Sequence, residues 1–437
     1  MRGVSVAMAE PKLNPAQAQA VEFFTGPLLV LAGAGSGKTR VITHRIARLI
    51  ARGVPAQSIV ALTFTNKAAG EMRERVAHTL ASRGGGASVA KQLTISTFHS
   101  FGLQVLTKEK AALGGAFTIF DQGDALGAIK EILRGYRGGK QFDAGAILAR
   151  ISAAKNAFVA PGELPDSDDE YDGITKEVFP KYQAALRQFR AFDFDDLVCE
   201  VARLFAERAD LRRRWQERYR FLLVDEYQDT NRAQLEVLRL LAEEHRNICV
   251  VGDDDQSIYA WRGADVRNIL DFEHHFPGAT IIKLEQNYRS RAPILAVANA
   301  VILKRTDAKY PKALFTDKPG GLKVQSRVAP TPDAEAAWVG REIRAAMRDQ
   351  GRKAREIAVL YRSNSQAKLI EEALREQGVP YRMVGGQQFF ERKEVKDLLA
   401  YLKVALNPAD EISLRRIVNY PARGIGEATV EKLAQHA

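Results

Sequence analysis

The chain has 437 residues, 46% of them hydrophobic, and its 64 Lys and Arg outnumber its 53 Asp and Glu to give a formal charge of +11. This length predicts about three domains with sizeable cores, and the basic excess favours a nucleic acid partner over the alternative of a solvated basic surface. No apolar run is long enough to cross a bilayer, residues 4–9 are too short for a signal-peptide core, and Cys199 and Cys249 lack metal-ligand spacing. The sequence therefore predicts no membrane partner and no zinc site, and it favours a cytoplasmic location.

The first predicted strand, residues 28–32, runs into a loop of small residues, 33–37, which ends at Lys38 and Thr39. The residues that follow mix polar and apolar side chains at helical spacing. Strand, Gly-rich loop and helix in this order predict a phosphate-binding loop, with Lys38 at the β- and γ-phosphates of ATP and Thr39 on Mg²⁺. Ala32 stands where such loops usually begin with Gly. A flexible linker is the alternative, but linkers do not lie between a buried strand and an amphipathic helix.

Two further strands are predicted at residues 58–63 and 93–97, separated by a charged helix and a break at residues 84–86. Phe64 and His99 follow these strands. Their rings stack on nucleic acid bases if they are exposed, although each taken singly is more often a core side chain.

Residues 104–190 lose the strand pattern and are rich in Lys, Arg, Ala and Leu. They predict an inserted helical subdomain of about 80–90 residues, with a loop at 161–172. Residues 192–197 return the chain to the α/β body.

The apolar strand at 221–224 ends in Asp225 and Glu226. A carboxylate at the end of a buried strand can hold Mg²⁺, which suits Asp225, and its neighbour Glu226 can deprotonate the attacking water. A solvated turn is the alternative. The carboxylate pair follows a buried strand and lies downstream of a phosphate loop, and this position favours a role in the nucleotide site.

The next strand, 247–252, leads to Gln256, Tyr259, Trp261 and Arg262. Gln256 suits a role as a sensor of the γ-phosphate. Two aromatic rings beside a guanidinium suit stacked bases and a phosphate, so this segment can couple ATP to nucleic acid. A packed turn is the alternative.

The strand at 280–284 precedes Tyr288 and Arg289, which suit adenine stacking and an arginine finger on the γ-phosphate from a second domain. A surface salt bridge is the alternative for Arg289.

Beyond residue 291 the pattern predicts a second α/β unit. Its strands are expected at 322–328, 357–361 and 381–384, its helices at 333–350, 366–377 and 391–406, and more helices follow. The turn at 423–429 resembles a hairpin between helices that can accept a DNA phosphate on its backbone amides, and an ordinary interhelical turn is the alternative.

Ten stretches in this order resemble UvrD/Rep/PcrA-type superfamily 1 DNA helicases: residues 13–17, 32–39, 62–69, 97–100, 192–197, 224–230, 252–264, 286–290, 359–364 and 385–392. The resemblance implies ATP- and Mg²⁺-dependent 3′-to-5′ movement on single-stranded DNA and unwinding of 3′-tailed duplexes, in DNA repair or replication. It implies ATP binding by Gln17, Ala32, Gly33, Ala34, Gly35, Ser36, Gly37, Lys38, Thr39, Arg40, Tyr288 and Arg289. It further implies catalysis by Lys38, Glu226, Gln256 and Arg289, Mg²⁺ binding by Thr39 and Asp225, and DNA binding by Phe64, His99, Tyr259, Trp261 and Arg262.

The expected fold is α/β, with a first RecA-like domain formed by residues 1–103 and 191–285 around the insertion 104–190. A second RecA-like domain is expected at 286–406, and a second helical insertion begins at 407. The family's Leu-His-Ser-Ala-Lys-Gly-Leu-Glu-type and Arg-rich motifs are not found, so the second domain is expected to be incomplete and unwinding weak. Two alternatives stay open: a non-motor fragment that binds ATP and single-stranded DNA, and a phosphate-loop ATPase that acts on another substrate.

Overall fold

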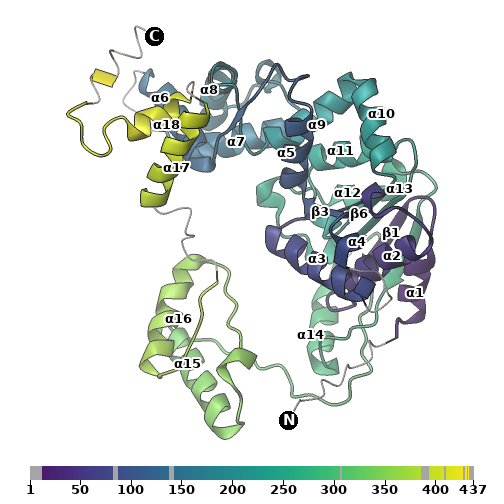
Figure 1. The fold of residues 1–437 in the computed structure, drawn as a ribbon. Coiled ribbons are helices and arrows are strands. Elements are labelled where there is room, and N and C mark those ends of the chain that lie inside the picture. The colour runs from purple at the N-terminus through teal and green to yellow at the C-terminus, as the bar shows by residue number, and fades with distance from the viewer. Residues whose placement is uncertain are drawn as a thin grey trace, which may run out of the picture.

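The computed structural model describes residues 12–81, 87–136, 142–305, 308–384, 393–407, 410–426, 429–430 and 432 (Figure 1). Its centre is a six-stranded sheet, all parallel, in the order β3-β2-β6-β7-β1-β8. The strands are β1 (Leu28–Ala32), β2 (Ile59–Thr63), β3 (Thr94–Thr97), β6 (Phe221–Val224), β7 (Ile248–Gly252) and β8 (Thr280–Leu284). Each lies within one residue of its predicted start. In β1, β2, β6 and β7 every residue is buried, and buried parallel strands read as continuous apolar runs.

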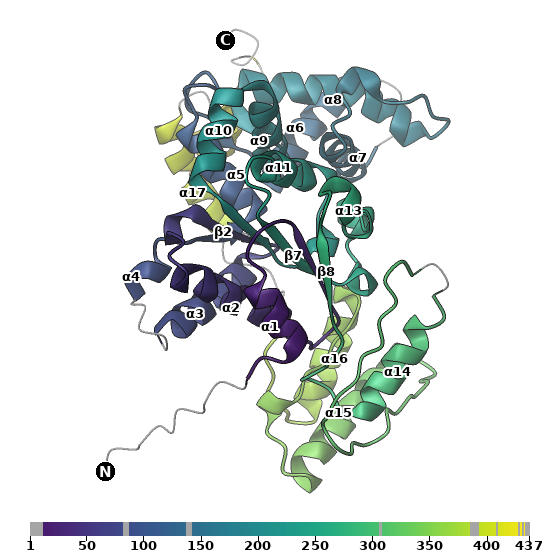
Figure 2. The ribbon, with the colours of Figure 1, turned by 90° about the vertical axis from the view of Figure 1, so that its right-hand side faces the viewer.

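Helices cover both faces of the sheet (Figure 2). Along β1, Leu29 and Leu31 enter one core while Leu28 and Val30 enter the other, as alternating strand side chains require. One face carries α1 (Pro15–Glu22), α2 (Lys38–Ala51), α3 (Asn66–Ala81) and α4 (Ala87–Ala90). The opposite face carries α5 (Phe98–Lys108), α9 (Asp196–Glu207), α10 (Ala209–Arg218), α11 (Arg232–Ala242), α12 (Arg267–Leu270) and α13 (Phe272–His275).

The predicted helical insertion has its own core, formed by α6 (Gln122–Arg134), α7 (Ala144–Asn156) and α8 (Glu170–Gln188). A two-stranded parallel sheet, β4 (Thr118–Ile119) and β5 (Ala191–Phe192), joins the points where the chain leaves and returns. The predicted loop at 161–172 contains a short 3₁₀ helix, Pro161–Glu163, and the start of α8. The predicted break at 84–86 lies outside the described residues.

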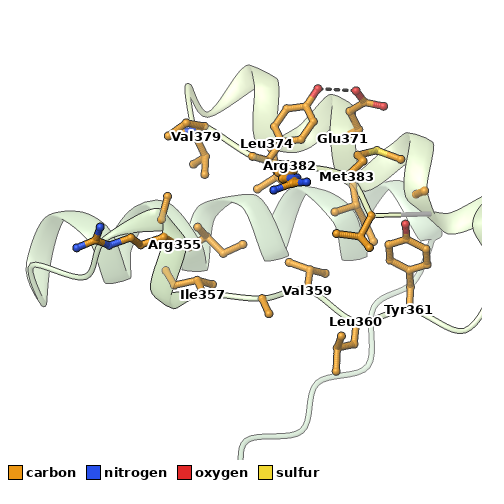
Figure 3. A pocket seen from close by; sticks show the side chains of 18 of the residues that line it. Arg355, Ile357, Val359, Leu360, Tyr361, Glu371, Leu374, Val379, Arg382 and Met383 are labelled. Carbon is orange, nitrogen blue, oxygen red and sulfur yellow. Dashed lines mark hydrogen bonds between the residues drawn. The ribbon is translucent and has the colours of Figure 1, made fainter. Parts of the chain in front are cut away.

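After β8 the described elements are helices: α14 (Ala292–Ile302), α15 (Pro332–Asp349), α16 (Asn364–Glu376), α17 (Lys393–Leu406) and α18 (Glu411–Ile417). The predicted strands at 322–328, 357–361 and 381–384 are wrong, because the structure forms none there. Side chains that favour strands are not enough to form one, because a strand also needs a neighbouring strand for its backbone hydrogen bonds. Two of these segments instead border an open apolar cavity of about 790 Å³ on α15 and α16 (Figure 3).

The last described helices lie beside the insertion rather than beside α15 and α16 (Figure 1). The family-like stretch at 385–392 and part of the predicted turn at 423–429 lie outside the described residues. Among the helices that the structure describes, none combines the length and the apolar composition that spanning a membrane requires.

Candidate functional site

The loop between β1 and α2 is packed so closely that two of its residues must be glycine. Gly35 and Gly37 have φ of +69° and +90°, in the left-handed region. A Cβ on Gly35 would lie 2.7 Å from Arg289 Cβ, and one on Gly37 would lie 2.8 Å from Gln17 Nε2. The loop is therefore held between α1 and the segment that follows β8.

Two buried nitrogen atoms of cationic side chains at the start of α2 have no hydrogen-bond partner among the described residues. Lys38 Nζ lies 3.2 Å from Glu226 Oε2, close enough for an ion pair, but it is buried and its geometry makes no hydrogen bond. Arg40 Nη2 is also buried without a partner. Because a helix N-terminus adds its own positive end, these groups fit a bound phosphate chain.

Asp225 lies where β6 ends and faces the start of α2. Its Oδ2 accepts a 3.4 Å hydrogen bond from Thr39 Oγ1. Burial and then the neighbouring carboxylate of Glu226 raise the pKa of Asp225 to about 6, and the same two causes raise the pKa of Asp229 to about 6. Carboxylate and hydroxyl oxygens are ligands that Mg²⁺ prefers, so Thr39 and Asp225 fit a magnesium ion beside the phosphates.

Glu226 adopts a left-handed backbone, with φ of +51°, and its side chain is 38% exposed. Gln228 Nε2 donates to Glu226 Oε2 over 3.0 Å, and Gln228 Oε1 accepts from the Asp253 N–H over 3.0 Å. This amide thus links the ends of β6 and β7. Gln228 was not among the predicted site residues, and its only signal in the sequence is its place two residues after the carboxylate pair.

Gln17 and Tyr288 both lie against the phosphate loop. Gln17 is fully buried, its Nε2 donates to Ser36 O over 2.8 Å, and its Oε1 accepts from the Asn14 N–H. Tyr288 is 38% exposed, and its N–H donates to Gly35 O over 2.9 Å. The structure thus brings the two residues to one edge of the loop, while their contacts with adenine stay predictions.

Arg289 follows β8 and touches the loop directly. Its N–H donates to Asn287 Oδ1 over 2.8 Å, and Asn287 Nδ2 donates to Ala34 O. Arg289 was expected to reach the γ-phosphate from a second domain. It lies on the segment that follows β8 and packs on the phosphate loop, and both its domain and its phosphate contact stay predictions.

Four of the predicted DNA-binding residues form one patch beyond β2 and β7. The rings of Phe64 and Tyr259 stack with centroids 5.1 Å apart and an interplanar angle of 29°. Tyr259 and Trp261 centroids are 6.3 Å apart, and the Arg262 guanidinium lies 4.6 Å from the Trp261 centroid. Trp261 is 64% exposed, so the patch offers a free ring face to a base.

His99 makes a different aromatic contact, with its ring edge-on to Phe194 at 6.1 Å. Burial lowers the pKa of His99, so its imidazole is neutral at pH 7. Phe194 is 49% exposed. It lies in the family-like stretch 192–197 but was not among the predicted DNA-binding residues.

Comparison with known proteins matches residues 13–277 to the UvrD/REP helicase N-terminal domain and residues 282–437 to the UvrD-like helicase C-terminal domain. The second match corrects the expectations that the C-terminal motifs are absent and that the second domain is incomplete.

The chain is also similar to proteins named ATP-dependent DNA helicase PcrA. It is 45% identical to that of Bacillus subtilis (strain 168) over 97% of this chain and 57% of the relative. It is 44% identical to that of Staphylococcus epidermidis (strain ATCC 12228) and 43% identical to that of Staphylococcus aureus (strain NCTC 8325), over 97% of this chain and 58% of each relative. The chain thus spans less than three-fifths of the length of these relatives.

Proposed function

Since the chain belongs to the UvrD/REP helicase family, we propose that it hydrolyses ATP at the phosphate loop and couples hydrolysis to movement along single-stranded DNA and strand separation. The observation that carries this proposal is one continuous edge of the sheet. Lys38 and Glu226 lie there 3.2 Å apart, and β7 leads from the same edge to the exposed Trp261.

The proposed roles at the nucleotide follow from the contacts. Lys38 and the loop amides bind the β- and γ-phosphates, while Thr39 and Asp225 hold Mg²⁺, which neutralises phosphate charge when it is bound. Glu226 takes a proton from the attacking water, because its carboxylate is half exposed and oriented by Gln228.

Arg289 and Gln256 are proposed to face the γ-phosphate. Arg289 is the better supported of the two, because its Cβ lies against the phosphate loop at Gly35. Gln17 and Tyr288 are proposed for the adenine end of the nucleotide.

The proposed DNA path runs over the patch of Phe64, Tyr259, Trp261 and Arg262, with His99 and Phe194 as a second contact. Only two residues separate Gln256 from Tyr259, so a shift at the γ-phosphate reaches the stacked rings directly. On the basis of the family we propose 3′-to-5′ movement and 3′-tailed duplex substrates. We also propose the domain boundaries and the cytoplasmic location that were expected from the sequence.

A DNA-stimulated ATPase assay tests the proposal, followed by strand separation on 3′-tailed and 5′-tailed duplexes. Hydrolysis is expected in the natural chain and is expected to be lost in Lys38→Ala and Glu226→Gln. Lys368→Ala, at an exposed lysine on α16, is the matched control. Hydrolysis that persists in Lys38→Ala rejects the ATP site, and DNA binding without any hydrolysis favours a non-motor binding protein.

A further inference from the structure

Lys312 places its ammonium among three consecutive carboxylates at the end of β7. Its Nζ lies 2.9 Å from Asp253 Oδ1 and 3.1 Å from Asp255 Oδ2, and it also contacts Asp254. The Lys312 side chain is only 3% exposed. Burial by itself lowers the pKa of Lys312, but the carboxylates, Asp253 first, raise it above its ordinary value. The ammonium therefore stays charged and offsets acids that are grouped closely enough to hold a metal ion.

The carboxylate of Asp253 transmits this contact to Gln256. Its Oδ1 faces Lys312 and also accepts a hydrogen bond from the Asp255 N–H over 3.3 Å, while its Oδ2 accepts a hydrogen bond from Gln256 Nε2. Because the two oxygens have different partners, the Lys312 ion pair and the Asp255 N–H together fix the orientation of the carboxylate and, with it, the position of the Gln256 amide.

The same turn is connected to the proposed general base. The Asp253 N–H donates to Gln228, whose amide donates to Glu226, which lies 3.2 Å from Lys38. Lys312 thus stands at one end of a chain of contacts that leads to the phosphate loop.

The segment that carries Lys312 also packs on the phosphate loop from another side. Lys283 Nζ donates to Pro311 O over 3.0 Å, and Phe315 forms a β-bridge with Gln286. A Cβ on Gly33 would run into the Leu314 side chain. One segment therefore contacts both the loop and the turn that holds Gln256.

We propose that Lys312 is a positioning residue for ATP turnover, because its ammonium orients the Asp253 carboxylate that holds the Gln256 amide. The inference rests on the proposed ATP hydrolysis. Lys312 itself is placed in no contact with the nucleotide, so its loss is expected to slow turnover and to leave nucleotide binding nearly unchanged.

The first test compares Lys312→Met, which removes the charge, with Lys312→Arg, which keeps it. Lys309→Met is the matched control, because Lys309 lies on the same segment but contacts Leu270 and Asp271. At saturating DNA, kcat for ATP is expected to fall about tenfold or more in Lys312→Met, with KM within about twofold of the natural chain. Lys312→Arg is expected to recover much of the loss, and Lys309→Met to lose none.

The second test is a double-mutant cycle with Gln256→Ala. If Lys312 acts through Gln256, adding Lys312→Met to Gln256→Ala lowers kcat by less than about twofold. Independent, multiplicative losses overturn the proposal, as does an unchanged kcat in Lys312→Met. If Lys312→Met does not fold, Asp253→Asn replaces it in the same cycle with the same expected outcome.

A failure of the proposed ATP hydrolysis can be distinguished from a failure of the proposed role of Lys312. In the first case the natural chain shows no ATP hydrolysis that depends on Lys38, whatever the residue at 312. If hydrolysis is lost in Lys38→Ala but unchanged in Lys312→Met, only the proposed positioning role of Lys312 is rejected.

Discussion

Asp225 is a buried charge that the folded protein holds at a cost. Burial and the neighbouring Glu226 raise its pKa to about 6, from an ordinary 3.8. Because the folded pKa is the higher one, folding favours the protonated acid. The stability that Asp225 contributes is therefore greatest below about pH 4 and falls as the pH rises through about 6.

Asp225→Asn is accordingly expected to raise the thermal midpoint at pH 8 by about 3–6 °C in the absence of Mg²⁺ and nucleotide, while abolishing ATP hydrolysis. The gain is expected to vanish at pH 4, where the natural side chain is itself neutral. Differential scanning fluorimetry at the two pH values measures it. Asp210→Asn, at an exposed carboxylate on α10, is the control, and a lower midpoint for Asp225→Asn at pH 8 contradicts the argument.

Trp261 is the residue on which the proposed DNA contact depends most. It is 64% exposed and is flanked by the Arg262 guanidinium, so its loss removes a stacking platform and little of the core. Trp261→Ala is expected to weaken binding of a single-stranded oligonucleotide about 10- to 100-fold at fixed salt, with a nearly unchanged thermal midpoint. Fluorescence anisotropy measures the affinity. Trp338→Ala, on α15, is the control, and equal losses in both variants contradict a specific contact.

The sequence alone could suggest a role for residues that carry their context with them, but not for residues that meet their partners only in the folded chain. Lys38 and Thr39 follow a loop of small residues, and Asp225 ends an apolar run, so each carries its context with it. Lys312 and Gln228 gain their roles only when separate segments meet at the end of β7, which no local pattern encodes.

At the scale of elements, the phosphate loop packs against the segment after β8 as well as following β1. Gly35 lies against Asn287 and Arg289, and the backbone of Tyr288 donates to it. The loop is therefore a shared surface between two parts of the chain, which are distant in sequence.

Gly35→Ala is expected to disturb this surface, because its Cβ would lie 2.7 Å from Arg289 Cβ and its φ is +69°. The expected result is a loss of nucleotide affinity and a destabilisation of about 1–3 kcal/mol. Gly70→Ala is the matched control. It lies on α3 with open space around its Cβ and is expected to stabilise that helix by about 0.5–1 kcal/mol. Nucleotide titration and chemical unfolding measure the two effects, and equal behaviour of the variants rejects the packing argument.

The four inner strands of the central sheet, β2, β6, β7 and β1, could be predicted because each is an apolar run that lies buried between two helical layers. The runs at 357–361 and 381–384 have similar side chains, but the described residues pair neither of them, and Val384 is 78% exposed. Strand propensity is an expression of packing and pairing, so the sequence pattern alone could not distinguish these two cases.

At the scale of the whole molecule, charged contacts hold α17 against the helical insertion. Lys403 Nζ lies 2.9 Å from Asp124 Oδ2, and Lys396 Nζ lies 3.6 Å from Asp121 Oδ2. Asn407 Nδ2 adds a 2.6 Å hydrogen bond to Thr118 Oγ1. These partners are more than 250 residues apart in the chain, so their pairing lay beyond prediction from local patterns.

Ion pairs of this exposure contribute about 0–1 kcal/mol each to stability. The two together therefore favour the packing of α17 on the insertion only modestly. The double charge reversal Lys396→Glu with Lys403→Glu places like charges opposite Asp121 and Asp124, and α17 is expected to leave the insertion. Small-angle scattering would then show a larger radius of gyration, and high salt would reduce the difference from the natural chain, because salt screens repulsion and attraction alike. Lys368→Glu on α16 adds the same kind of charge change away from the insertion and is expected to leave the scattering unchanged. An unchanged radius in the double variant at low salt would mean that contacts other than these two ion pairs hold this end of the molecule in place.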